Sequence, residues 1–234
     1  MNRNSNTYTI VYSTILVVIV AAVLAFVSVK LGPTQQANID NEKTAALLAA
    51  VGVNVEDSQV SKTFDQVVND AFLVDEAGNK VEGDAFKTDL KTQYDNMRLG
   101  KPFVLPVYEC TLANGTQVVL LSAYGAGLWG PIWGYISLEK DLETIHGVSF
   151  AHQGETPGLG AEIVNPKFMA KFAGKKAIKD GACVFSVVKG EVKDESCQVD
   201  GITGATLTSR GLSDMIGSWF EKYIPYLNKC KVEE

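Results

Sequence analysis

The sequence predicts an α+β domain, a bent antiparallel sheet flanked by helices, preceded by one N-terminal transmembrane helix. Two strand-like runs, Phe103 to Leu112 and Thr116 to Ala123, flank Asn114-Gly115, which is the strongest short-range signal for a β-hairpin. The run from Ile10 to Val29 is dense in apolar residues and long enough to cross a hydrocarbon core of ~30 Å. Near the C-terminus, apolar residues between 212 and 223 recur at helical spacing.

The N-terminal apolar run predicts an uncleaved membrane anchor. No charged residue occurs from Asn4 to Val29, and we expect a short tail over residues 1–9 and a transmembrane helix over residues 10–30. A cleaved signal peptide is the alternative, but Phe26-Val27-Ser28-Val29 lacks a small-x-small cleavage site. Flanking charges do not fix the orientation. The short tail before a long C-terminal domain favours an exported domain.

The region after the anchor predicts a mixed helical segment over residues 31–100, followed by the site-bearing domain over residues 101–234. Gly32-Pro33 is expected to end the first helix, and Ala37 to Val51 to form a juxtamembrane helix. A further helix is expected from Phe64 to Leu73, before the turn-rich stretch Asp75 to Lys80.

Gly125 to Gly130 matches the GxGxxG pattern of dinucleotide-binding folds and follows a predicted strand. A dinucleotide site requires a helix after the glycines, whereas Pro131 here begins an aromatic strand. The glycines therefore indicate a bend, which would let Trp129 and Trp133 lie against something flat. Further strands are expected over Trp133 to Leu138, Ile145 to Ala151 and Val184 to Val188.

Composition narrows the function. With 21 basic and 27 acidic residues the net charge is −6, and the basic residues are scattered and form no stripe. We therefore do not expect nucleic-acid binding. The four cysteines form no CxxC pair and neither histidine lies near them in sequence, so we expect no metal site built by this chain alone. Cys183 and Cys197 lie symmetrically about Gly190, where a hairpin would permit a disulfide. Two half-buried free thiols are the interpretation we favour.

The most informative segment runs from Asp200 to Ser209, between a strand ending near Val199 and the C-terminal helix, which we expect Pro225 to end. Its small polar residues thus lie at a helix N-terminus, where free backbone N–H groups and the helix dipole favour an anion. Gly204 and Ala205 would let a phosphate approach the backbone. An ordinary helix cap is the alternative.

A second loop runs from Glu155 to Gly160. Pro157 and Gly158 suit the two central positions of a type II turn, which would present Leu159 at its exit. The loop is either a rigid connection or one wall of a ligand slot, with Leu159 packed on a flat apolar ring and backbone amides at its polar edge.

Both segments resemble the FMN-binding-domain family. Thr203-Gly204-Ala205-Thr206, preceded by Asp200, resembles its flavinylation motif, and the stretches Gly127 to Tyr135 and His152 to Ile163 are also similar. The resemblance implies that a flavin transferase joins FMN covalently, through its phosphate, to Thr206. It also implies a cofactor site made of Asp200, Thr203, Gly204, Ala205, Leu207, Thr208, Glu155, Thr156, Pro157, Gly158, Leu159, Gly160, Trp129 and Trp133. Of these, we expect Leu159, Trp129 and Trp133 to contact the ring, and Thr156 and Gly158 its polar edge.

The order and separation of these motifs, together with one span, resemble the flavin-bearing subunit of sodium-translocating NADH:quinone reductases. The resemblance implies a single-pass protein of the bacterial inner membrane with its domain on the extracytoplasmic side. Such a chain is not catalytic alone but relays electrons among other subunits of a multi-subunit membrane complex. A subunit of the ion-translocating ferredoxin:NAD reductases is one alternative. The other is a non-redox, membrane-anchored assembly or binding module.

Overall fold

The computed structural model describes residues 6–233, and the chain divides into two compact units, Met1–Lys43 and Thr44–Glu234. Helix α1 (Asn6–Ala50) runs through the boundary and is long and apolar enough to cross a membrane. The predicted break at Gly32-Pro33 is wrong, since Pro33 lies inside α1. A proline removes one main-chain hydrogen bond, and a helix of 45 residues has many further turns to absorb that loss. Of the predicted tail, residues 1–5 lie outside the described part and residues 6–9 are helical.

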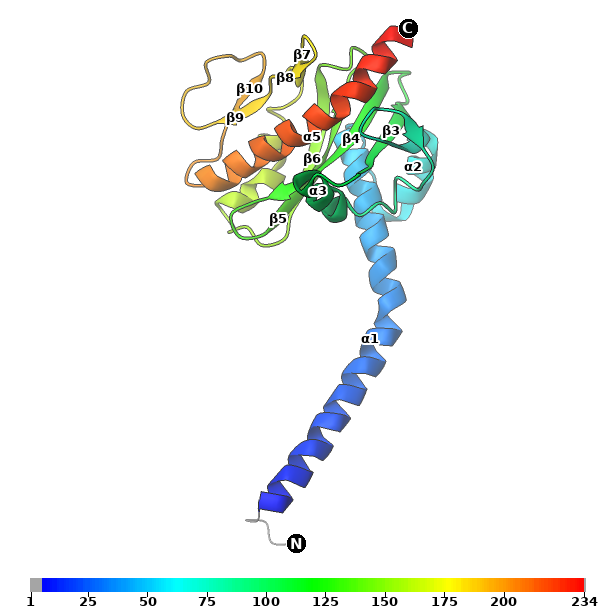
Figure 1. Ribbon diagram of the computed structural model, residues 1–234, viewed down its shortest axis with the longest axis vertical. Helices are drawn as coiled ribbons and strands as arrows, with labels where there is room; N and C mark the ends of the chain where they lie inside the picture. The colour runs from blue at the N-terminus through cyan, green and yellow to red at the C-terminus, as the bar shows by residue number, and fades with distance from the viewer. Residues whose placement is uncertain (1–5, 234) are drawn as a thin grey trace. The chain divides into compact units, whose positions relative to one another are not determined.

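The second unit is built on a six-stranded antiparallel sheet, which confirms the predicted fold class (Figure 1). Its strands are β1 (Val68–Val74), β2 (Lys80–Val81), β3 (Leu105–Thr111), β4 (Gln117–Ala126), β5 (Pro131–Leu138) and β6 (Ile145–His152), in the order β2-β1-β3-β4-β5-β6. Because β1 from the predicted segment 31–100 pairs with β3, both parts of the sequence contribute to one sheet. The domain division at residue 101 stays a prediction.

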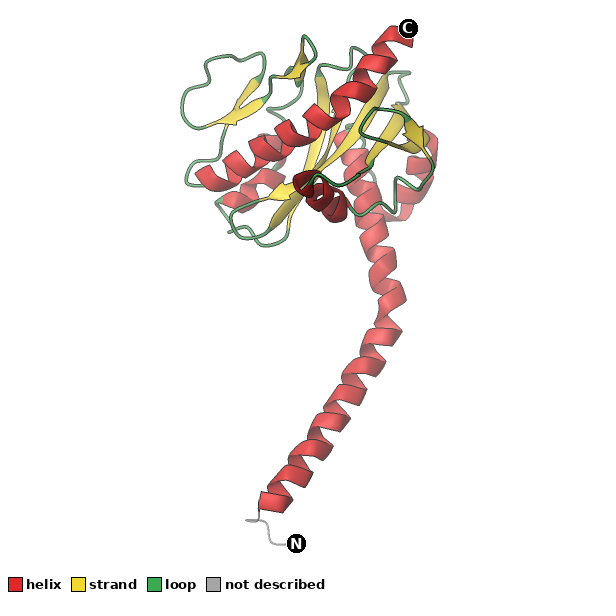
Figure 2. Ribbon diagram, in the orientation of Figure 1, coloured by secondary structure: helices red, strands yellow, loops and turns green. Residues whose placement is uncertain are grey.

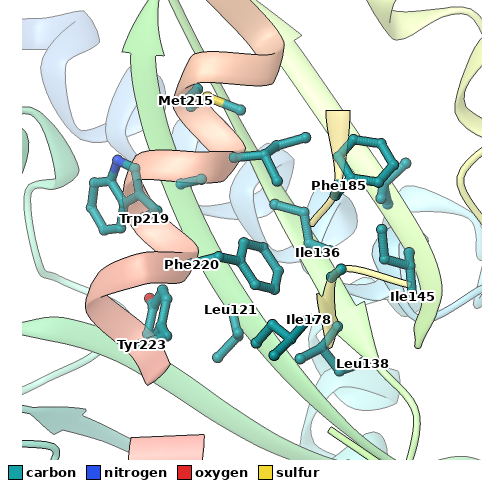
Figure 3. Packing of buried hydrophobic residues seen from close by; sticks show 14 of the residues in the cluster. Leu121, Ile136, Leu138, Ile145, Ile178, Phe185, Met215, Trp219, Phe220 and Tyr223 are labelled. Atoms are coloured by element: carbon teal, nitrogen blue, oxygen red, sulfur yellow. The ribbon is translucent and has the colours of Figure 1, made fainter. Parts of the chain in front are cut away.

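The two faces of the sheet carry separate cores. Helix α5 (Thr206–Glu233) packs along one face, where Trp219 and Phe220 lie with Leu121 and Ile136 in one buried cluster (Figures 1 and 3). The indole N–H of Trp219 also donates to the Tyr124 carbonyl at 2.7 Å. The last turns of α1 and helix α2 (Val60–Val67), which follows the 3-10 helix η1 (Asp57–Gln59), contribute to the core on the opposite face. Period-two alternation along β4 sends successive side chains to the two cores.

The predicted hairpin at Asn114-Gly115 forms. Leu112 N–H donates to Thr116 O at 2.8 Å across the Asn114-Gly115 turn, and Gly115 has a φ of +83°. The glycine-rich stretch after β4 is also a hairpin turn, closed by Gly127 N–H to Gly130 O at 2.8 Å. Strand β5 follows it directly, so the context of a dinucleotide site is absent at this turn.

Two helix predictions need correction. The helix expected from Phe64 to Leu73 ends at Val67, because residues 68–74 pair with β3 and the sheet outweighs local helix propensity. Pro225 does not end α5, which continues to Glu233. Tyr226 and Leu227 beyond the proline are buried in the core, and their packing holds the chain helical.

The remaining elements surround the sheet (Figure 2). They are α3 (Leu90–Leu99), 3-10 helix η2 (Gly160–Val164), α4 (Pro166–Met169), β7 (Ile178–Lys179), β8 (Ala182–Cys183), β9 (Ser186–Val188) and β10 (Gln198–Asp200). Strands β9 and β10 pair in parallel, so the connection through Gly190 is no antiparallel hairpin. Cys183 and Cys197 are free, the first half-buried and the second buried.

Candidate functional site

Thr206 is the first residue of α5, and hydrogen bonds fix the conformation of the turn before it. Strand β10 ends at Asp200, and the Ala205 N–H donates to Ile202 O at 3.0 Å, with Gly204 at a φ of +80°. The Ser209 N–H makes the first bond of the helix, to Ala205 O at 2.9 Å. The backbone N–H groups of residues 206–208 therefore precede the first intrahelical bond and form the positive end of α5.

A cavity of about 250 Å³ opens beside Thr206. It is lined by Val188, Lys189, Gly190, Asp200, Gly201, Ile202, Thr203, Gly204, Thr206 and Ser209. The predicted site residues Asp200, Thr203, Gly204 and Thr206 thus meet at one place. The sequence did not indicate Lys189 and Gly190, because only the parallel pairing of β9 with β10 brings their connection to the cavity.

The 155–160 loop forms the predicted turn. The Leu159 N–H donates to Thr156 O at 3.1 Å and Gly158 has a φ of +73°, as a type II turn requires at its second central position. Leu159 is half exposed and lies over Gly204, where an added Cβ would come within 2.9 Å of Leu159 Cδ2. The loop and the turn before α5 are therefore in direct contact.

Glu155 links three segments of the site. It is 5 % exposed; its Oε1 accepts from the Trp129 N–H at 2.9 Å and its Oε2 from Thr208 Oγ1 at 2.6 Å. One carboxylate thereby joins the 127–130 turn, the 155–160 loop and the first turn of α5. Both Glu155 and Thr208 were predicted to contact a cofactor. The structure turns their polar atoms toward each other, and direct contact with a cofactor stays a prediction for both.

Large apolar side chains are exposed on the same three segments. Trp129 is 69 % exposed and Leu207 58 %, and Leu128 and Leu159 are also exposed. We call these four residues the exposed apolar patch. Leu128 was missed from the sequence, although its position next to Trp129 in one turn was a usable signal. Trp133 is not part of the patch: it is half-buried in β5, opposite Tyr124.

Three charged side chains lie at or near the cavity: Lys189 and Asp200 in its lining, and Lys171, which pairs with Asp200. Lys171 Nζ donates to the Asp200 carbonyl at 3.4 Å and lies 4.0 Å from the Asp200 carboxylate. The predicted acidic residue of the motif is thus partly neutralised by a cation from the segment after α4. The backbone N–H groups at the start of α5 and the Lys189 side chain are the candidate donors for an anion.

Comparison with protein families matches this part of the chain. The family model of the FMN-binding domain matches residues 127–221, which begin in the β4–β5 turn and end within α5. The matched region contains all three segments that Glu155 joins. The fold and the site thus define a protein of the FMN-binding-domain class.

Relatives narrow this class to NqrC, a subunit of the Na(+)-translocating NADH-quinone reductase. The protein of this name from Haemophilus ducreyi is 31% identical, with 98% of this chain and 96% of the relative covered. That of Neisseria meningitidis serogroup B is 32% identical, with 91% and 90% covered. The solved structure from Parabacteroides distasonis is 41% identical with a TM-score of 0.77, covering 84% of this chain and 96% of its own. Shewanella oneidensis NqrC is 28% identical with a TM-score of 0.73, covering 84% and 99%. This chain belongs to the NqrC family.

Proposed function

We propose that this chain is a membrane-anchored flavoprotein subunit that carries FMN as a phosphoester on Thr206. It relays electrons within a Na+-translocating NADH:quinone reductase. The observation that carries the proposal is the position of Thr206, which lies both at the N-terminus of α5 and on the wall of a cavity within the FMN-binding domain. A phosphate esterified there would be held by the N–H groups of residues 206–208, which precede the first intrahelical bond.

The turn before Thr206 depends on a glycine. A Cβ on Gly204 would approach Leu159, and its φ of +80° is unfavourable for L residues. Gly204 therefore lets the turn form and leaves room for Leu159 beside the start of α5. Bound FMN would supply reversible uptake and release of electrons, and the chain would supply binding and orientation. The ester holds the cofactor at a fixed effective concentration without joining its ring to the protein electronically.

The exposed apolar patch is the candidate surface for the ring. Leu159 lies against Gly204 in the turn before α5, and Leu207 follows Thr206 directly. The Trp129 backbone is bonded to Glu155, which also accepts from Thr208 in α5. These side chains would shield one face of the ring from water, while the backbone at Thr156 and Gly158 offers polar groups to its edge. Because the patch is exposed, a ring lying on it stays accessible to a redox centre of a neighbouring subunit.

Attachment requires an activated donor. Condensing FMN with an alcohol in water is unfavourable, so the donor must be an anhydride of the FMN phosphate such as a flavin dinucleotide. The Oγ1–P bond to Thr206 forms while the P–O–P bond of the donor breaks. The hydroxyl proton passes to a base of the flavin transferase, and the nucleoside monophosphate leaves. The transferase is therefore a necessary partner during maturation, in addition to the other subunits of the complex.

We further propose that α1 anchors the chain in the bacterial inner membrane as a single span, with the domain on the extracytoplasmic side. The apolar length of α1 supports the span. A protease added to intact spheroplasts should digest the domain. Digestion only after lysis would contradict this orientation.

Covalent attachment is tested by in-gel flavin fluorescence. The full chain is expressed with its flavin transferase, denatured, and separated on a gel. The wild-type band should fluoresce and Thr206→Ala should not. Ser218→Ala removes a hydroxyl from the same helix outside the site and should fluoresce fully. A dark wild-type band would refute the proposal and favour a non-redox assembly module. A fluorescent Thr206→Ala band would refute Thr206 as the attachment residue.

A further inference from the structure

The buried carboxylate of Glu155 holds the first turn of α5 in place. The Glu155 side chain lies between the 127–130 turn and α5, and both of its oxygens are occupied by hydrogen bonds. Space for it depends on two glycines. A Cβ on Gly127 would lie 2.4 Å from Oε1, and a Cβ on Gly160 would lie 2.2 Å from Oε2 and 2.5 Å from Thr208 Oγ1. This close fit fixes where the carboxylate can be.

The bond to Thr208 fixes the rotation of the helix about its axis. Successive residues of an α-helix are rotated by about 100°, so residues 206 and 208 point to nearly opposite sides. Thr208 is 1 % exposed and directed at Glu155, whereas Thr206 is half-buried beside the cavity and Leu207 is exposed. Holding Thr208 inward therefore directs the Thr206 hydroxyl outward.

The other buried hydroxyl of this turn has a different role. The Ser209 hydroxyl accepts from the Ile202 N–H at 3.0 Å and so fixes the preceding turn, 202–205, to the helix. That bond stays within the 200–209 segment and does not reach the sheet or the 155–160 loop. Among residues 6–233, Glu155 is the group that ties the first turn of α5 to both neighbouring loops.

We infer that Glu155 is a positioning residue for flavin attachment: through Thr208 it sets the rotation of α5 that presents the Thr206 hydroxyl to the flavin donor. This inference rests on the proposed function. Glu155 does not touch the reacting atoms, and its effect passes through the first turn of the helix. A shift of about 1 Å in a reacting group can slow a reaction by about a hundredfold, so loosening this turn should be measurable as a rate.

The test uses the full chain in detergent, the flavin transferase and its flavin donor, with initial rates measured against chain concentration. Thr208→Val keeps the shape of the side chain and removes the donor, and Glu155→Ala removes the acceptor. Both should lower kcat about a hundredfold with KM little changed. Partial unfolding would instead remove acceptor molecules, which raises the apparent KM and leaves kcat unchanged.

Conservative variants separate the hydrogen bond from the charge. Thr208→Ser keeps the hydroxyl and should retain the wild-type kcat. Glu155→Gln should also retain it, because the amide oxygen accepts from the Trp129 N–H while the amide NH₂ donates to Thr208 Oγ1. Combining Glu155→Ala with Thr208→Val should cost no more than the worse single variant, since both break one bond.

The outcomes are distinguishable. Any of three results would overturn the positioning role: a wild-type kcat in Thr208→Val, a kcat in Thr208→Ser as low as in Thr208→Val, or additive losses in the double variant. If flavin fluorescence still depends on Thr206, the proposed function stays intact. A wild-type chain that accepts no flavin would overturn both.

Discussion

Two glycines of α5 make a matched pair for testing how closely the helix packs on the sheet. A Cβ added to Gly211 would lie 2.3 Å from the backbone carbonyl of Ala126 in β4, whereas one added to Gly217 would meet nothing within 4 Å. Glycine in a helix interior costs about 1 kcal/mol relative to alanine. Gly217→Ala should therefore stabilise the protein by roughly that amount.

Gly211→Ala should do the opposite. A carbonyl carbon–oxygen group within a strand cannot rotate away, so the helix must move outward by about 1 Å to restore ordinary contact. Overpacking of this kind typically costs 1–3 kcal/mol. After subtracting the gain in helix propensity, the net change is a destabilisation of up to about 2 kcal/mol. The two variants should therefore differ by roughly 1–3 kcal/mol.

Thermal unfolding followed by circular dichroism measures the difference. For a chain of this size, 1 kcal/mol corresponds to a shift of about 2–4 °C in Tm. Effects on the unfolded chain are alike in the two variants and cancel in the comparison. Equal Tm values for Gly211→Ala and Gly217→Ala would refute the close approach of α5 to β4.

Three further predictions concern other parts of the fold. Tyr223→Phe removes the hydroxyl that donates to Pro106 O at 2.7 Å in the core, and should lower the free energy of unfolding by about 1–3 kcal/mol in urea titration. Burial raises the pKa of Asp141, but hydrogen bonds from Lys176 and Thr144 outweigh it and hold this pKa well below its usual range. Ionised Asp141 therefore stabilises the fold fully above about pH 4 and progressively less below it. Asp141→Asn should lower the free energy of unfolding by roughly 1 kcal/mol at pH 7, a value reduced for the partial exposure of Asp141, and by less in acid. Burial raises the pKa of the Cys110 thiol to about 12, so iodoacetamide at pH 8 should leave Cys110 unmodified in the native protein and modify it after unfolding, as read by mass spectrometry.

Local signals in the sequence predicted local structure well. The Asn114-Gly115 hairpin and the turn at Pro157-Gly158 depend on the backbone preferences of two adjacent residues, and both formed as expected. The switch from α2 to β1 at Val68 and the continuation of α5 through Pro225 depend on distant partners. Pattern and propensity do not contain that information.

The site also has a part that local sequence indicates and a part that depends on distant contacts. Thr206 and the residues before it could be identified because a motif and a helix start coincide in the sequence. The bond between Glu155 and Thr208 joins residues 53 positions apart, and no periodicity indicates it. A glutamate in a loop ordinarily suggests contact with solvent or ligand. Only the folded chain shows Glu155 to be buried beneath the turns it connects.

The final turns of α1 determine where a water-soluble fragment can begin. Leu47 and Leu48 are each about 1 % exposed and belong to the core on the second face of the sheet. Burying such side chains contributes about 1.5–3 kcal/mol each, and whole domains are stable by only about 5–15 kcal/mol. A fragment cut after Ala50 would lose part of its own interior, whereas one that starts at or before Thr44 retains it. Expression boundaries should therefore follow the packing of α1 and not the end of its apolar run.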